Sequence, residues 1–304
     1  MQDPQPDFKP SVGVAEDLSP GLRRILAPNP SPMTFRGTNT YLLGTSELAV
    51  IDPGPDDPAH LQAIESAVLP GQKITHIFVT HAHLDHSPLA SPLANRVDAP
   101  VLAFGRAEDG RSKTMTRLAL SGCVGGGEGV DQAFAPDIHL SDDQVIKGKD
   151  WSLRALHTPG HMANHLCFAW DNVLFSGDLV MGWASSLVSP PDGDLGGFMA
   201  SLQRLDRTSW DTFHAGHGAP ITTPNARVQE LLAHRMARES SILEGLAAGP
   251  ANAQRLARMI YTETPEALLP AASRNVLAHL IDLMDKSFIE PVSELSETAV
   301  FRRI

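Results

Sequence analysis

The 304-residue chain has little of what disulfide-rich, fibrous or membrane-spanning proteins require. Its two cysteines cannot build a disulfide scaffold, and their unlike surroundings favour a reducing compartment. No apolar run approaches the roughly 20 residues that cross a bilayer, and the N-terminal segment lacks the basic and apolar regions of a secretory signal. With 42% hydrophobic residues, the chain is predicted to be a globular, cytoplasmic protein that has no membrane partner.

Positive charge is also scarce. The formal net charge is −11, whereas proteins that coat phosphate backbones need clustered lysine and arginine. The glycine-rich stretch at 121–129 lacks the Lys-Ser/Thr ending of a phosphate-binding loop, and its many glycines predict a loop. Both observations argue against a nucleotide-binding or duplex-DNA-coating protein.

The first two thirds of the chain alternate short apolar runs with helical spacing, which is typical of an α/β protein. A helix is expected at 58–68, and strands are expected at 41–43, 48–51, 74–80, 101–104, 151–156, 165–170 and 172–175. The last two strands lie close enough in sequence to form a hairpin.

The pattern changes near residue 224. Thr223-Pro224 begins a long helical stretch that ends at Gly249-Pro250. Two further helices are expected at 254–261 and 271–286, followed by a hairpin of 288–289 with 299–301. Three helices and a two-stranded wing predict a winged-helix domain at 225–304, after a catalytic domain at 1–224.

The residues with the clearest chemistry follow the strand at 74–80. His81, His83, Asp85 and His86 lie within six residues of one another at a strand end. Three imidazoles and a carboxylate are costly to crowd together without a shared cation. The sequence therefore predicts a metal site here, with more ligands than one tetrahedral ion needs once distant residues are added.

Three distant positions share the same local pattern, in which a ligand-type residue lies beside glycine at the end of an apolar strand. They are His161 in Thr158-Pro-Gly-His, Asp178 in Ser176-Gly-Asp, and His217 in Ala215-Gly-His-Gly. Glycine lets the backbone approach a metal closely and lets the neighbouring side chain be aimed. Each turn alone is weak support, but together with the first cluster they predict a site for two divalent metals.

In this order, these residues resemble the five-motif signature of the metallo-β-lactamase superfamily. The resemblance implies a four-layered αβ/βα sandwich with two metal ions. It assigns His81, His83 and His161 to the first ion, Asp85, His86 and His217 to the second, and Asp178 to both. Asp52 in Val50-Ile-Asp-Pro-Gly matches the aspartate that supports the ligand loop. The segment 30–43 and the appended helices further resemble the β-lactamase-like protein 2 group, in which hydrolases carry a C-terminal winged helix.

The expected activity is hydrolysis of an ester, thioester or phosphodiester by a hydroxide that bridges two Zn²⁺ ions, with Asp85 as a proton shuttle. Iron or manganese could replace zinc. Within the same resemblance, the alternative is a single-strand RNA endonuclease, so a small molecule and single-stranded RNA both stay open as substrates. Trp183 is expected either to stack on the substrate in the cleft or to pack onto its own domain.

A hypothesis of another class is a winged-helix regulator that binds nucleic acid and carries an accessory metal site. Charge argues against it, since residues 225–304 hold nine lysines and arginines against ten acidic residues. The expected recognition helix sets Arg274 and Lys286 against Asp282 and Asp285. We therefore expect no duplex DNA partner, and we expect the C-terminal domain to wall the cleft or to form a homo-oligomer.

Overall fold

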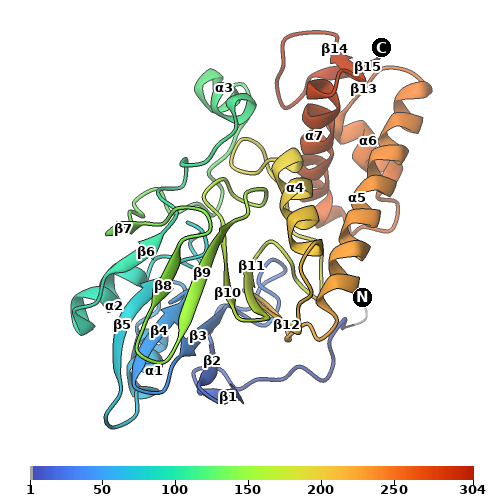
Figure 1. Ribbon diagram of the computed structural model, residues 1–304. Coiled ribbons are helices and arrows are strands. Elements are labelled where there is room, and N and C mark those ends of the chain that lie inside the picture. Colours follow the sequence, from blue (N-terminus) through green and yellow to red (C-terminus); the bar gives the residue numbers. More distant parts are fainter. Residues whose placement is uncertain (1–2) are drawn as a thin grey trace.

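Seven strands form the first β-sheet of the computed structural model, which describes residues 3–304 (Figure 1). In spatial order they are β1 (Glu16–Ser19), β2 (Leu22–Leu26), β3 (Asn39–Leu43), β4 (Glu47–Ile51), β5 (Lys73–Phe78), β6 (Val101–Ala103) and β7 (Ile138–His139). β1 to β4 are antiparallel and β4 to β7 are parallel. Helices α1 (Pro58–Ser66) and α2 (Ala90–Val97) connect the parallel strands, as parallel pairing requires a crossover.

Five strands form the second sheet. In spatial order they are β12 (Thr212–Ala215), β11 (Val173–Gly177), β10 (Leu166–Trp170), β9 (Ser152–His157) and β8 (Val145–Lys147). All neighbours are antiparallel except β11 and β12, which helix α4 (Leu195–Asp206) connects. The predicted hairpin is confirmed as β10 and β11.

Alternating side chains divide the core into layers. In β4, Ala49 and Ile51 pack between the two sheets, whereas Leu48 and Val50 pack toward α1 and α2. In β10, Phe168 faces the first sheet and Cys167 faces α4. Because strand residues point to opposite faces in turn, helices, sheet, sheet and helices stack as four layers. This confirms the predicted sandwich fold.

The C-terminal unit contains α5 (Pro224–Ala247), α6 (Ala253–Ile260), the 3₁₀ turn η1 (Glu266–Leu268), α7 (Leu269–Asp285) and a small sheet. The expected two-stranded wing, β14 (Ile289–Pro291) and β15 (Val300–Arg303), gains a third strand, β13 (Ala251–Asn252), on the free edge of β15. Met115 and Leu118 of α3 (Lys113–Ser121) belong to the apolar core of this unit. The C-terminal helices therefore pack against an element of the sandwich domain.

Among residues 3–304, no helix combines the length and the apolar character that crossing a membrane requires.

Candidate metal centre

The segment after β5 places four of the predicted ligands at the carboxyl edge of the first sheet. The backbone N–H of Thr80 donates to Asp52 Oδ1 at 2.7 Å, which fixes the chain where the strand ends. The chain then turns, with the N–H of His86 donating to the carbonyl of His83 at 3.0 Å. The side chains of His81 and His86 are fully buried, whereas that of Asp85 is 25% exposed. Asp85 and the half-buried His83 are therefore the ligand-type residues of this segment that solvent and substrate can reach.

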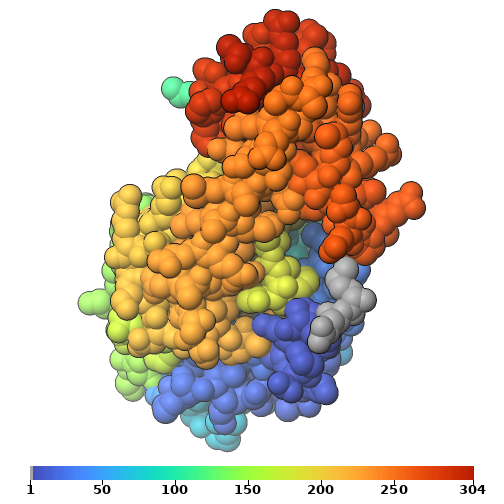
Figure 2. Space-filling view, turned by 90° about the vertical axis from the view of Figure 1, so that its right-hand side faces the viewer, coloured from blue at the N-terminus to red at the C-terminus, as the bar shows by residue number. Residues whose placement is uncertain are grey.

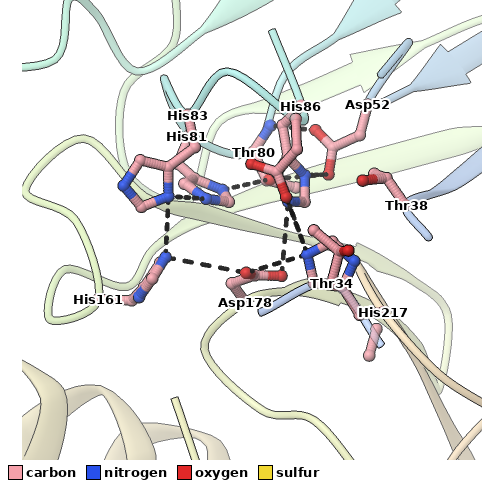
Figure 3. A network of polar contacts seen from close by, with 12 residues as sticks. Thr34, Thr38, Asp52, Thr80, His81, His83, His86, His161, Asp178 and His217 are labelled. Atoms are coloured by element: carbon pink, nitrogen blue, oxygen red, sulfur yellow. Dashed lines mark hydrogen bonds and ion pairs between the residues drawn. The ribbon is translucent and has the colours of Figure 1, made fainter. Parts of the chain in front are cut away.

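The second sheet supplies the other three residues. His161 follows β9, Asp178 follows β11 and His217 follows β12. β9, β11 and β12 run in the same direction, so their carboxyl ends meet at one edge of the sheet. Figure 3 shows these side chains facing the β5 segment across the gap between the sheets, with Asp178 between His161 and His217.

The seven predicted side chains come together in one cluster. His83 Nδ1 lies 2.9 Å from His81 Nε2 and 3.0 Å from His161 Nε2. His217 Nε2 lies 3.1 Å from Asp85 Oδ2 and 3.4 Å from His86 Nε2.

Asp178 lies between these two groups, with Oδ2 3.8 Å from His161 Nε2 and 3.4 Å from His217 Nε2. Three groups of side chains lie close enough together to hold an ion. One consists of His81, His83 and His161, and another consists of Asp85, His86 and His217. The third, between these two, consists of His81, His86 and Asp178.

The outer nitrogens of two imidazoles are held by backbone carbonyls. His161 Nδ1 lies 2.7 Å from the carbonyl of Leu187, and His217 Nδ1 lies 3.1 Å from the carbonyl of Gly37. Because a carbonyl can only accept, both rings carry a proton on Nδ1, and Nε2 is the nitrogen that faces the cluster. A partner on the outer nitrogen is the usual arrangement around metal-bound histidine.

Asp178 Oδ1 has no hydrogen-bond partner within residues 3–304 although it is buried. Imidazole nitrogens and carboxylate oxygens that face one another at such short range fit a shared cation, and this donor set of nitrogen and oxygen suits zinc.

Electrostatics inside the cluster separate the histidines. Burial lowers the pKa of His83 to about 3 and, helped by neighbouring imidazoles, lowers that of His81 well below its usual value. Burial also opposes the charged form of His86, but the carboxylates of Asp85, Asp52 and Asp178 outweigh it and raise the pKa of His86 to about 9. The first group thus presents neutral imidazoles, whereas in the second group the carboxylates of Asp178 and Asp85 also raise the pKa of His217 well above its usual value, against the effect of burial.

Asp52 supports this cluster from behind. Its carboxylate accepts the Thr80 N–H and the Thr80 hydroxyl, the latter at 2.8 Å, and lies 2.9 Å from His86 Nδ1. The Thr80 hydroxyl oxygen in turn lies 2.9 Å from His81 Nδ1. Asp52 therefore orients one histidine directly and another through Thr80, a role for Thr80 that the sequence reasoning missed.

His165 is a second residue that the sequence reasoning missed. It is fully buried, and its Nε2 accepts the backbone N–H of Asp178 at 3.2 Å. Its Nδ1 lies 3.0 Å from the Thr158 hydroxyl. His165 therefore holds the backbone that presents Asp178. In the sequence, His165 is marked only by its place next to Asn164, four residues after His161.

A cavity of about 180 Å³ opens onto the cluster and is lined in part by His83, Asp85, His161 and Asp178. Trp183 does not line it, because its ring stacks on that of Phe35 at 5.0 Å between centroids. The second alternative for Trp183, packing onto its own domain, is therefore the observed one. Cys167 is buried, which raises the pKa of its thiol to about 12, so it behaves as a small core residue.

The chain belongs to the metallo-beta-lactamase superfamily, whose pattern residues 33–217 match, and its fold and enzyme class are those of a metal-dependent hydrolase of that superfamily. Residues 253–287 match the beta-lactamase associated winged helix domain. Both parts of the predicted resemblance are thereby confirmed.

Individual relatives span most of the chain. The beta-lactamase-like protein 2 homolog of Drosophila melanogaster is 33% identical over 280 residues, which cover 88% of each chain. Atrochrysone carboxyl ACP thioesterase AgnL7 of Paecilomyces divaricatus is 31% identical over 84% of this chain and 73% of its own. The crystal structure of a metallo-beta-lactamase family protein from Thermus thermophilus superposes with a TM-score of 0.74 at 26% identity, covering 95% of this chain and all of the other.

Proposed function

We propose that this protein is a dinuclear zinc hydrolase that cleaves an acyl thioester. The observation that carries the proposal is the meeting of two three-residue groups, one all-histidine and one with Asp85, around the unpaired carboxylate oxygen of Asp178. Each group offers the three protein ligands of a catalytic zinc site, which leaves a position open for water or substrate.

Two zinc ions would supply a water of lowered pKa and a Lewis acid for the carbonyl oxygen. The chain supplies the rest. Asp85 lines the cavity together with Asp178, and nearby His86 and His217 hold the pKa of Asp85 below the usual range although burial alone would raise it. It is therefore ionised at neutral pH and able to accept the proton of the attacking water.

The cavity lining favours an acyl group over a phosphodiester. Among residues 3–304, no lysine or arginine lines it, and the exposed carboxylate of Glu128 stands at its edge. A nucleic-acid backbone would bring further phosphates next to this carboxylate without a cation to pair them. Met33, Met181 and Leu187 line the same cavity and suit an acyl chain.

A thioester also has a leaving group that needs no proton donor. The hydroxyl oxygen of water adds to the carbonyl carbon, the C–S bond breaks, and its electron pair leaves on sulfur. A thiol with a pKa near 8.5 leaves as thiolate close to neutral pH without prior protonation. The relative AgnL7, which is named as an ACP thioesterase, supports this choice of bond.

Zinc is proposed because the first group consists of three imidazoles, and iron or manganese remain the alternatives that metal analysis will decide. We also propose a cytoplasmic location, which fits the two unpaired thiols, Cys123 and Cys167.

The test is an activity panel on protein of measured metal content. It compares S-acetyl-N-acetylcysteamine, a nitrophenyl ester, bis-nitrophenyl phosphate and a labelled single-stranded RNA, each with and without chelator. We expect the thioester to have the highest kcat/KM and the chelator to abolish its hydrolysis. Preferential cleavage of RNA would refute the thioester proposal in favour of the endonuclease alternative, and chelator-resistant thioester hydrolysis would refute the metal centre.

A further inference from the structure

A groove of about 660 Å³ continues from the metal cavity along the C-terminal helices. The groove and the cavity share four lining residues, Met33, Glu128, Leu187 and Ser189. Figure 2 looks onto a hollow between the orange C-terminal helices and the blue N-terminal segment. The volume of the groove is within the range of sites that bind drug-sized ligands. A substrate that reaches the candidate metal centre therefore has room to extend past it.

The C-terminal side of this groove carries both apolar and polar side chains. Ala253 of α6, Leu269, Pro270, Ala271 and Leu277 of α7 line it. Gln254, one turn before Arg258 on α6, adds a side-chain amide that can both donate and accept a hydrogen bond. An extended, uncharged ligand with amide groups fits such a surface.

Two arginines line the groove, and only one of them is available to a ligand. Arg274 donates to Ser189 Oγ at 2.8 Å and to Glu297 Oε1 at 2.6 Å, and also to the backbone carbonyls of Gly125 and Pro190. Arg258 is exposed and has no hydrogen bond or ion pair with any residue in the described part of the chain. The groove therefore offers one free guanidinium.

The acidic residues restrict what this guanidinium can bind. Glu297 pairs with Arg274, which leaves Glu128 near the metal cavity and Glu266 on η1 as uncompensated carboxylates. A ligand with a charge on every unit would meet these carboxylates along its length. A ligand whose single anionic group lies at the end remote from the scissile bond would avoid this repulsion.

We propose that this groove binds the thiol-side arm of the substrate, and that Arg258 binds a single phosphate at the far end of that arm. The ligand of this chemistry is a 4′-phosphopantetheine thioester, an extended arm with two amides and one terminal phosphate. The proposal rests on the thioesterase function above and identifies the leaving group. The same phosphorylated arm occurs free, in coenzyme A and on carrier proteins, and kinetics distinguish these sources.

The experiment compares three acetyl thioesters that share the scissile bond. S-acetyl-N-acetylcysteamine lacks most of the arm, S-acetyl-pantetheine has the arm without phosphate, and S-acetyl-4′-phosphopantetheine has both. We expect kcat/KM to rise with each addition, the phosphate contributing about tenfold, as one charge-assisted contact at a partly solvated site allows. Acetyl-coenzyme A and an acetylated carrier protein, as further substrates, show which carrier of the arm is preferred.

Arg258→Gln should remove the tenfold advantage of the phosphate through KM while leaving kcat/KM for acetyl-pantetheine unchanged. Arg255→Gln is the matched control, because Arg255 is exposed on the same helix but does not line the groove. Ala271→Phe, which fills the groove from α7, should lower kcat/KM for both arm-bearing thioesters and spare S-acetyl-N-acetylcysteamine. Calorimetry with 4′-phosphopantetheine itself should give a Kd about tenfold weaker for Arg258→Gln than for the Arg255→Gln control.

The outcomes separate the two levels of the proposal. Hydrolysis of S-acetyl-N-acetylcysteamine with no gain from the arm or the phosphate overturns the groove proposal and keeps the thioesterase. Equal losses in the Arg258→Gln and Arg255→Gln variants overturn the role of Arg258. Failure of the metal-loaded protein to hydrolyse any of the three thioesters overturns the thioesterase function and the groove proposal with it.

Discussion

Gly216 is the position where the smallest change should have the largest effect on the metal centre. A Cβ added there would lie 2.4 Å from Asp178 Oδ1 and 2.7 Å from His86 Cε1, where ordinary contacts begin near 3.4 Å. The backbone cannot retreat freely, because the Gly216 N–H donates to the carbonyl of Gly177 and its carbonyl accepts from the N–H of Asn39, both at 2.8 Å. Two proposed ligands must therefore move by about 1 Å. A misplacement of this size in a catalytic site costs about 100-fold in rate.

The Gly216→Ala variant should thus lose about 100-fold in kcat/KM for a thioester and bind fewer than two metal ions per chain by elemental analysis. Gly216 does not have a positive φ, so alanine is allowed there and the test isolates the contact from backbone strain. Gly197→Ala in α4 is the control, since its Cβ meets only ordinary contacts of 3.4 Å and more. A Gly216→Ala protein with two metal ions and activity within twofold of the unmodified chain would refute the packing argument.

Three further predictions concern the same molecule. Asp85→Ala and His86→Ala should each lower kcat/KM for a thioester by at least about 100-fold, one by removing the proton acceptor and the other a ligand; retained activity in both would contradict the two-metal scheme. Asp52→Ala leaves His86 and Thr80 without their shared carboxylate, so competition with a chelator should show metal affinity lowered by about 10- to 100-fold, and an unchanged affinity would exclude this supporting role. Burial, reinforced by the charge of Arg235, lowers the pKa of His279 to about 3. In the unfolded chain this histidine binds a proton as the pH falls through about 6.5, whereas in the folded chain it stays neutral there. The free energy of unfolding should then fall by about 2 kcal/mol for this residue between pH 7 and pH 5, and urea unfolding of His279→Leu should show that much less acid sensitivity.

The metal-centre residues could be predicted because the sequence keeps them in short, recognisable segments. His81, His83, Asp85 and His86 share one strand end, and a glycine beside His161, Asp178 and His217 marks each distant turn. Their supports could not be predicted in the same way. Thr80 and His165 act through hydrogen bonds whose partners, Asp52 and Asp178, become neighbours only in the folded chain.

Strand β2 shows why part of the first sheet escaped prediction. Arg23 and Arg24 interrupt the apolar alternation of this strand, yet both side chains are buried. Arg24 Nη2 pairs with Glu16 Oε2 at 2.5 Å, and Arg23 donates to the carbonyl of Ala67 and to Gln72 Oε1. Burying a guanidinium group costs less where partners satisfy it, and these partners lie on other elements that the local pattern does not reveal.

The packing of α7, the last helix of the C-terminal unit, favours a hydrolase over a regulator that binds nucleic acid. A recognition helix at 271–286 would need one face free to enter a DNA groove. In the fold, α7 is buried on more than one side, because Ala278 packs into the core of the second sheet while Val276 and Leu280 pack into the core of the C-terminal unit.

The cations of α7 are also engaged, Arg274 with Glu297 and Lys286 with Asp282 and Glu239. A helix held in this way has little surface or charge left for a duplex. Its remaining accessible edge, which includes Ala271 and Ser273, lines the groove that leads to the candidate metal centre. We therefore propose that the winged helix is a wall of the catalytic cleft, and changes along that edge should alter which thioester is accepted before they alter the chemistry at the proposed metal site.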